Sequence, residues 1–492
     1  MMINLGALEK DRAGIDTGLL TIARNAYPTT IGWEPMPRMV QVTSWALPAA
    51  CKGLFFARTA SGGYQVYAGT ATKLYKLVSN IWVDYTRTVG GNYATGSANF
   101  WQGAQWGSLL ILVNGSDAPQ VIDVDSGATN FSALAGSPPV SVYIGVVGDF
   151  VFLMDATNRK RAINCGTTGP NTATSWTVGT DLCDEYIAPD GGSITSPPML
   201  GEYGLVMQEG GIARRIVLQP GDAFAAFRFE KIEGIKGCVG GYSCVAANGK
   251  IFYQAEDGVY SLGPDGSNTP VGSQRVDRYF RENSDQARLN EFQAFADPYS
   301  TRIYWAYYTT SSATTFDGLL GYDWLLDRFF FSDAAAAFWA PIIIPGQTLE
   351  ALAIEYPDLD AMTVSLDSRQ FQGGRPTIGA VRANGGLVLL SGTPGDATIQ
   401  TSAVQLVPPV RALNTEVEVR GDLGSASVEV WVGKRERPSQ ALSWVGPFTP
   451  SEETGIAYPH VSARHHAFEV RLTGEWTNIQ QIATTEQADG ER

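Results

Sequence analysis

The amino-acid sequence predicts an all-β protein, formed mainly by a β-propeller of about six or seven blades and completed by a smaller C-terminal β-sandwich. Three observations predict this class: the composition, a long repeat, and alternation of polar and apolar residues near the C-terminus. The 492 residues include 54 Gly, 26 Pro, 12 Trp, 20 Tyr and 21 Phe. Such a composition is typical of aromatic strands joined by tight turns.

A repeated unit is the main signal for the propeller. Each copy begins at a Gly-containing or polar turn and continues into a run of apolar or aromatic residues. The copies lie at residues 52–57, 106–113, 148–154, 203–208, 248–254 and 301–307. Their spacing of about 40 to 55 residues is typical of propeller blades. A chain of two or three β-sandwiches is the alternative, but its strands would recur every 8 to 12 residues without the longer period.

The repeat divides the chain into four regions. We expect an N-terminal extended arm over 1–40, the propeller over 41–404, a β-sandwich over 405–482 and a flexible tail over 483–492. Six units fit between about residues 40 and 345, a seventh and less regular unit is expected at 349–390, and a distant strand is expected to close the first blade. Strict alternation at 416–420, 426–432 and 467–472 predicts the sandwich strands. Residues 276–280 and 286–292 are the best candidates for short helical turns.

Charge and cysteine content exclude several classes of protein. The net charge of −14 argues against a surface that grips nucleic-acid phosphates, although DNA can pass through an acidic channel without adhering. The five cysteines, Cys51, Cys165, Cys183, Cys238 and Cys244, contain no Cys-x-x-Cys pair. This spacing predicts neither a disulfide framework nor structural zinc. No secretory signal is visible, and no apolar run reaches the ~20 residues of a membrane helix, so we expect folding in a cytoplasm and no membrane-spanning segment.

The residues that most often carry chemistry have a structural interpretation here. His460, His465 and His466 are expected to be surface histidines near a turn, since adjacent strand residues point to opposite faces and cannot share one metal. A pair of glycosidase carboxylates is the enzymatic alternative. Its candidates are Asp123, Asp149, Glu256, Asp257, Asp323 and Asp327. Asp149 and Asp257 lie beside Gly in turns, where Asp is favoured for conformational reasons.

Three further patterns have structural interpretations. Asp123–Gly127 resembles the start of a calcium loop, but the twelfth position is Leu134 instead of Glu, so a turn is expected. The tryptophans Trp82, Trp101, Trp106, Trp305 and Trp324 are expected to pack in the core or between blades. Arg275–Arg278 either pairs charges locally or contacts a neighbouring subunit. The sequence therefore predicts no enzyme, with no catalytic, cofactor-binding or metal-ligating residue, and it does not identify the residues that contact partners.

Several stretches of the first 300 residues match a known pattern. Near the N-terminus they are Ala23–Asn25, Pro28, Gly32–Trp33 and Pro35–Pro37, an Asn, a Pro and a Gly-x-x-Pro-x-Pro segment ahead of the first blade. The others are Phe55–Thr59, Tyr67–Thr70, Leu74–Tyr75, Val113–Gly115, Ala118–Val121 and Gly272–Arg278. In these stretches the chain resembles the tail nozzle, or packaged-DNA stabilisation, proteins of short-tailed (podovirus-type) bacteriophages.

The resemblance implies a role and a set of partners. It implies a virion tail subunit, assembled in the host cytoplasm, that forms a homo-hexameric ring below the portal and adaptor. Such a ring holds and conducts the genome DNA without reading its sequence and seats tail fibres or spikes. No cofactor is implied, and the C-terminal sandwich has no counterpart in the matched stretches. The alternatives are a carbohydrate-binding or glycan-hydrolysing propeller and a receptor-binding tail protein.

Overall fold

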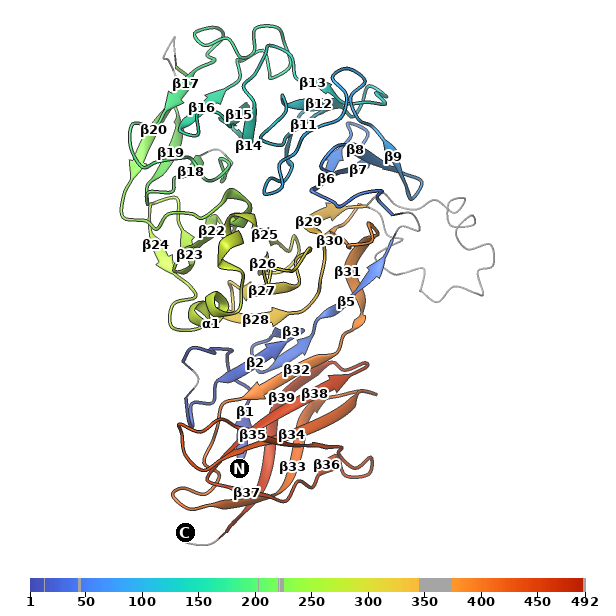
Figure 1. Ribbon diagram of the computed structural model, residues 1–492, viewed down its shortest axis with the longest axis vertical. Helices are drawn as coiled ribbons and strands as arrows, with labels where there is room; N and C mark the ends of the chain where they lie inside the picture. The colour runs from blue at the N-terminus through green and yellow to red at the C-terminus, as the bar shows by residue number, and fades with distance from the viewer. Residues whose placement is uncertain are drawn as a thin grey trace.

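The computed structural model describes residues 1–12, 14–42, 46–201, 203–219, 221, 225–344 and 374–489. Figure 1 shows a ring of small sheets above a β-sandwich, with the first and last strands of the chain, β1 and β39, both in the sandwich. The predicted all-β class, with a propeller and a smaller sandwich, is confirmed. The arrangement follows from how the strands bury their side chains.

The first three blades are four-stranded antiparallel sheets whose strands pair in chain order. Blade one contains β6 (Gly53–Arg58), β7 (Tyr64–Gly69), β8 (Leu74–Val78) and β9 (Ile81–Asp84). Blade two contains β10 (Gln102–Trp106), β11 (Leu109–Val113), β12 (Gln120–Asp123) and β13 (Ser132–Ala133). Blade three contains β14 (Ser141–Val147), β15 (Phe150–Asp155), β16 (Arg161–Asn164) and β17 (Glu185–Ile187).

The next three blades vary this pattern. Blade four contains β18 (Gly204–Met207), β19 (Ala213–Leu218) and β20 (Phe227–Ile232), and residues 194–199 are bridged to the inner edge of β18 at Ile194 and Met199. Blade five contains β21 (Val245–Ala247), β22 (Lys250–Ala255), β23 (Gly258–Leu262) and β24 (Asn268–Pro270). Blade six contains β25 (Gln293–Ala296), β26 (Arg302–Tyr307), β27 (Gly318–Asp323) and β28 (Arg328–Ser332), and its sheet continues into the sandwich.

The last place in the ring is a sheet that joins two distant parts of the chain. It contains β29 (Phe338–Ile343), β30 (Pro376–Val381), β31 (Leu387–Pro394) and, as its outer strand, β5 (Pro37–Gln41). Val40 pairs with Leu389, and the Val42 N–H donates to the Leu387 carbonyl at 2.9 Å. β29 in turn contacts β6 of blade one. A distant strand therefore closes a blade as expected, but it closes the last blade and not the first.

Burial explains why the sequence repeat consists of apolar runs. In β11, Ile111 and Val113 pack into one hydrophobic cluster with Leu153 of blade three, whereas Leu110 and Leu112 pack into another with Tyr67 of blade one. A blade strand between two neighbours is buried on both faces, so it shows a continuous apolar run where a half-buried strand shows alternation.

The sandwich is assembled from both ends of the chain. One sheet contains β1 (Met2–Asn4), β3 (Ala26–Pro28), β4 (Trp33–Pro35), β33 (Ala412–Asp422), β36 (Ile456–Ala457), β37 (Val461–Ala463) and β39 (Asn478–Ala488). The other half is β2 (Leu20–Arg24), β32 (Ala397–Thr401), β34 (Ser427–Arg435), β35 (Ser443–Phe448) and β38 (His465–Thr473), joined to blade six where β2 pairs with β28. Val417 and Ile482 of the first sheet share a hydrophobic cluster with Val430 and Val470 of the second.

These pairings correct several expected boundaries. The N-terminal 40 residues are not a separate arm, because β1–β4 belong to the sandwich and β5 to a blade. The sandwich begins at β32, before residue 405, and β39 continues to Ala488 through the expected tail because it pairs along β33. The expected seventh unit starts earlier, at β29, and residues 345–373 of it lie outside the described residues. The two short helices, α1 (Asp277–Glu282) and η2 (Gln286–Glu291), lie where helical turns were expected; a third, η1, spans Gly241–Ser243.

The N-terminal stretch 23–37 forms the joint between propeller and sandwich. The Asn25 side chain donates to Asp333 Oδ1 at 2.8 Å and accepts a hydrogen bond from Ser332 Oγ at 2.7 Å. The Tyr304 hydroxyl of blade six donates to the Tyr27 hydroxyl at 3.1 Å. Trp33 is fully buried and its indole N–H donates to the Gly6 carbonyl at 3.2 Å.

A close backbone approach explains the glycine beside Trp33. A Cβ atom on Gly32 would overlap the carbonyl of Ile479 in β39, so only glycine fits where the β3–β4 hairpin meets the sandwich. On the blade side, the Arg302 guanidinium lies 3.9 Å from the centre of the Tyr27 ring and pairs with Glu34 at 2.5 Å. The joint is therefore a packed and hydrogen-bonded interface between the two modules.

Candidate functional site

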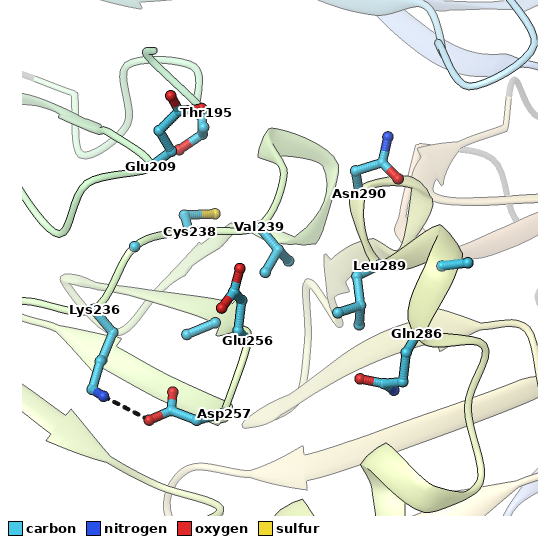
Figure 2. A pocket seen from close by; sticks show the side chains of 13 residues that line it. Thr195, Glu209, Lys236, Cys238, Val239, Glu256, Asp257, Gln286, Leu289 and Asn290 are labelled. Atoms are coloured by element: carbon cyan, nitrogen blue, oxygen red, sulfur yellow. Dashed lines mark ion pairs between the residues drawn. The ribbon is translucent and has the colours of Figure 1, made fainter. Parts of the chain in front are cut away.

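The main candidate site is a cavity of about 560 Å³ between blades four and five and the helix η2 (Figure 2). Its wall is built from loops that lie at one face of the ring. Thr195 precedes β18, Glu209 lies in the β18–β19 turn, and Glu256 and Asp257 form the β22–β23 turn. The loop from Lys236 to Val239 and residues Gln286–Asn290 complete the wall. Three carboxylates against one lysine give the cavity an acidic, polar lining.

Asp257 is neutralised by its neighbours. Its carboxylate lies 2.7 Å from Lys236 Nζ, which Figure 2 draws as an ion pair, and it accepts a hydrogen bond from the Tyr260 hydroxyl at 3.0 Å. Partial burial opposes ionisation of Asp257, but the Lys236 and Tyr260 contacts outweigh it and lower its pKa. A carboxyl held ionised in this way suits an electrostatic role and not that of a general acid.

Glu209 and Glu256 provide the remaining negative charge. Glu209 accepts a hydrogen bond from Ser193 Oγ at 3.3 Å. Figure 2 shows the Glu256 carboxylate directed toward the middle of the cavity, and none of the described residues forms a hydrogen bond or ion pair with it. The lining therefore favours polar neutral or cationic groups and disfavours phosphates.

A second hollow of about 440 Å³ lies beside the first and also includes Asp257. Asp277, at the start of α1, lines it and is only 8% exposed. Burial, together with the charges of Asp11 and Asp257, raises the pKa of Asp277 to about 7, although its carboxylate accepts the Val259 N–H at 3.2 Å. Gly258, at φ +153°, has no room for a side chain because a Cβ there would overlap this carboxylate.

The other candidate carboxylates are dispersed among the blades. Asp123 ends β12 and accepts the Asp125 N–H at 3.0 Å, and Asp149 is an exposed residue of the β14–β15 turn. Asp323 accepts a hydrogen bond from Thr301 Oγ1 and the N–H of Leu325. Asp327 pairs with Arg275 at 2.7 Å. The structure thus brings together only Glu256 and Asp257 of the candidate set, and the other carboxylates of the two hollows are Glu209, Asp11 and Asp277.

The histidines correct one expectation. His460 is exposed in a turn, as expected, but His465 and His466 lie in β38 and are only 3% and 0% exposed. The His466 ring Nε2 lies 3.1 Å from the Val461 carbonyl. Burial lowers the pKa of both side chains. They are buried because β38 lies between β32 and β34 and is covered on both faces.

The remaining patterns have structural roles. Asp123–Gly127 forms a turn in which Asp125 accepts the Ala60 N–H at 3.0 Å. The described residues contain no group of three or more His, Cys, Asp or Glu arranged to hold a metal ion. Trp101 and Trp305 are 2% and 0% exposed, which confirms the expected packing role for these two. Arg275 pairs within the chain with Glu9 and Asp327, which are distant from it in sequence, and Asp11 accepts the N–H groups of Arg278 and Tyr279 at the start of α1. No helix among the described residues is long and apolar enough to cross a membrane.

Sequence reasoning missed Glu209 and the special position of Asp277. Glu209 lies in a Gly-rich turn, Gln208–Gly211, which resembles many surface turns of the chain. Asp277 follows Val276 in a charged stretch, which is typical of a solvent-exposed start of a helix. Neither carries a local signal of burial or of a shared cavity, because both properties come from packing between different blades.

Comparison with known proteins adds the following. No family model matches the chain, and no curated protein matches it. Among solved structures, the N-terminal domain of Nup159 is similar over 74% of this chain and 97% of its own, with a TM-score of 0.41 and 9% identity. The Pan2 WD40 domain of Neurospora crassa is similar over 71% and 94%, with a TM-score of 0.40 and 7% identity. A chain of the mitotic checkpoint complex is similar over 72% and 92%, with a TM-score of 0.38 and 9% identity. The chain's own sheets and their order around the ring establish it as a β-propeller joined to a β-sandwich.

Proposed function

We propose that this protein is a structural component of a virion: a tail nozzle subunit that forms a ring below the portal and adaptor of a short-tailed phage. In this role it retains and conducts the genome and seats tail fibres. The main support for the proposal is the position of the N-terminal residues in which the sequence resembles nozzle proteins. Asn25, Trp33 and their neighbours form the joint between propeller and sandwich.

A firm joint suits a load-bearing subunit. Both modules meet at buried aromatic residues and at hydrogen bonds that involve side chains of blade six, so the propeller is held in a fixed relation to the sandwich. A ring that retains pressurised DNA needs subunits that do not bend at such a connection. The net charge of −14 is compatible with the proposal, because a net acidic chain has few clustered basic side chains to which DNA phosphates would adhere.

Electron cryo-microscopy of phage particles, together with the mass of the purified protein mixed with its adaptor ring, tests the proposal. We expect six copies around an axial channel at the end of the tail. A Trp33→Ala variant should enter particles poorly, whereas a Tyr299→Ala variant, which changes an exposed tyrosine on a blade turn, should enter normally. A protein that stays monomeric with the adaptor and is absent from particles would contradict the proposal.

A carbohydrate-binding or glycan-hydrolysing propeller is the second candidate, favoured by one observation. Asp257 and Asp277 line the same hollow, and their pKa values move in opposite directions. Two carboxyls with separated pKa values are the arrangement that glycoside hydrolysis uses. Release of reducing sugar from envelope glycans, lost in both Asp257→Asn and Asp277→Asn but kept in Asp149→Asn, would support this function. The absence of both binding and hydrolysis would remove it.

A further inference from the structure

We propose that Cys238 and Cys244 are an oxidisable pair that closes a disulfide across the loop at the hub of the propeller. Their Sγ atoms lie 3.0 Å apart, while both residues are thiols in the structure. The side chains are 2% and 8% exposed, so the pair is shielded from bulk solvent. The proposal does not depend on the proposed function, because it concerns how one loop is held.

The loop is already fixed by three other blades. The Tyr242 hydroxyl donates to the Phe100 carbonyl at 3.1 Å, ahead of blade two. The Gly241 N–H donates to the Tyr143 hydroxyl of blade three at 3.2 Å. The Trp305 indole N–H of blade six donates to the Ser243 carbonyl at 3.0 Å. These contacts hold the two cysteines at opposite ends of η1, so bond formation requires little movement of the backbone.

Cys238 is the more reactive member of the pair. Its burial opposes ionisation, but its polar contacts, first of all the hydrogen bond from the Cys244 thiol, outweigh this and lower its pKa, whereas the pKa of Cys244 is raised well above the ordinary value. Burial raises the pKa of the other three thiols, to about 12 for Cys51 and about 11 for Cys165 and Cys183. Among the five, Cys238 is therefore the expected nucleophile.

The cavity gives a small oxidant access to this sulfur. Cys238 is part of the cavity wall, and Figure 2 shows it between Glu209 and Val239. The Cys238 thiolate attacks one sulfur of a small cationic disulfide such as cystamine, which suits the acidic lining, and releases one cysteamine thiolate, which takes up a proton. The Cys244 thiol then loses its proton and attacks the Cys238 sulfur, which releases the second cysteamine. The two protein thiols are oxidised to one disulfide, and the reagent is reduced to two thiols.

The disulfide would restrain the loop at the hub of the propeller. It closes a short ring of residues around Gly241–Ser243, the segment that contacts blades two, three and six. The loop stays open in a reducing cytoplasm and closes in an oxidising environment. Closure in an oxidising environment therefore stabilises the propeller hub.

Peptide mapping of the native full-length protein tests the proposal. Trypsin cleavage after Lys236 and Lys250 yields one peptide, 237–250, that contains both cysteines and no other. After treatment with cystamine we expect this peptide to lose two hydrogens, and the thiols counted in denaturant to fall from five to three. A Cys244→Ser variant should instead retain cysteamine on Cys238, and a Cys51→Ser variant should close the bond normally. A peptide 237–250 that keeps both thiols, or equal oxidation of Cys51, Cys165 and Cys183, would overturn the proposal.

Hydrogen exchange measures how strongly the disulfide restrains the loop. In the oxidised protein we expect the amides of residues 240–243 to exchange roughly tenfold more slowly than in the reduced protein, because opening of the loop is restrained. The exchange of β9, on the outer edge of blade one, serves as the internal reference. Equal exchange of residues 240–243 in the two states would show that the bond forms without holding the hub.

Discussion

The propeller and the sandwich are made of the same kind of strand but of very different stretches of chain. Blades one to six pair strands that follow one another along the sequence. The sandwich pairs residues from opposite ends of the chain, such as Met2 with Ala483 and Leu20 with Thr401. The blades are therefore specified by local repeats, whereas the sandwich also requires contacts between the two ends of the chain.

Removal of N-terminal strands should have the largest effect and should act differently on the sandwich and on the propeller. A chain that begins at Met36 lacks β1–β4 and should lose the cooperative unfolding of the sandwich while the propeller still folds, because β5 remains to close the ring. A chain that begins at residue 42 lacks β5 as well and should open the ring and aggregate, since the edge of β31 is left unpaired. Thermal unfolding by circular dichroism and size-exclusion chromatography measure both. Equal behaviour of the two truncated chains would contradict a closing role for β5.

Replacement of either of two buried tryptophans should lower the stability of a different region by a similar amount. Trp33→Ala in the joint and Trp101→Ala between blades one and two each remove a nearly fully buried indole and should cost about 3–5 kcal/mol. Trp101 also donates its indole N–H to the Thr70 carbonyl at 2.8 Å. Urea unfolding combined with limited proteolysis should locate the first loss in the sandwich for Trp33→Ala and in the propeller for Trp101→Ala. The Trp→Phe variants should lose less, as size-matched controls.

Asp277 should make the propeller less stable as the pH rises. The folded-state pKa of about 7 lies above the usual 3.8, so between these values the folded state holds one more proton than the unfolded chain. The free energy of unfolding therefore falls as the pH rises from about 4 to about 7. At pH 8, Asp277→Asn should stabilise the propeller by about 2 kcal/mol, because the amide keeps the acceptor for Val259 and removes a buried charge. Denaturant unfolding at pH 5 and 8 measures this, and a gain of equal size at both pH values would contradict it.

His466 should make the sandwich less stable as the pH falls, which is the opposite of the effect of Asp277. Its folded-state pKa lies below the ordinary 6.5, so as the pH falls below about 6.5 the unfolded chain binds more protons and the free energy of unfolding decreases. The loss should reach about 1 kcal/mol per pH unit. A His466→Gln variant should lose part of this slope and a His465→Gln, His466→Gln double variant more of it, because burial lowers the pKa of both side chains. His460→Gln, at an exposed turn, should retain it. If the full slope survives in the double variant, another group is responsible.

The candidate site was only partly predictable. Glu256 and Asp257 could be named from the sequence because they form a polar turn at the end of an apolar run. Glu209 and the raised pKa of Asp277 could not, since they depend on how blades four and five pack against each other and on the carboxylate's position between Gly258 and Gly272. The short approach of Cys238 to Cys244 likewise requires the bend of η1, which has no residue pattern of its own.

By itself the sequence determined the all-β class, the blade repeat, the two helical turns after blade five and the alternating strands of the sandwich. These features are local: a strand buried on both faces needs an apolar run, and a half-buried strand needs alternation. The tertiary structure alone decided that β5 closes the last blade, that β1–β4 build the sandwich and that His465 and His466 are buried. Pairing between segments hundreds of residues apart depends on which strand edges remain free after the local hairpins have formed, and the repeat in the sequence carries no record of that choice.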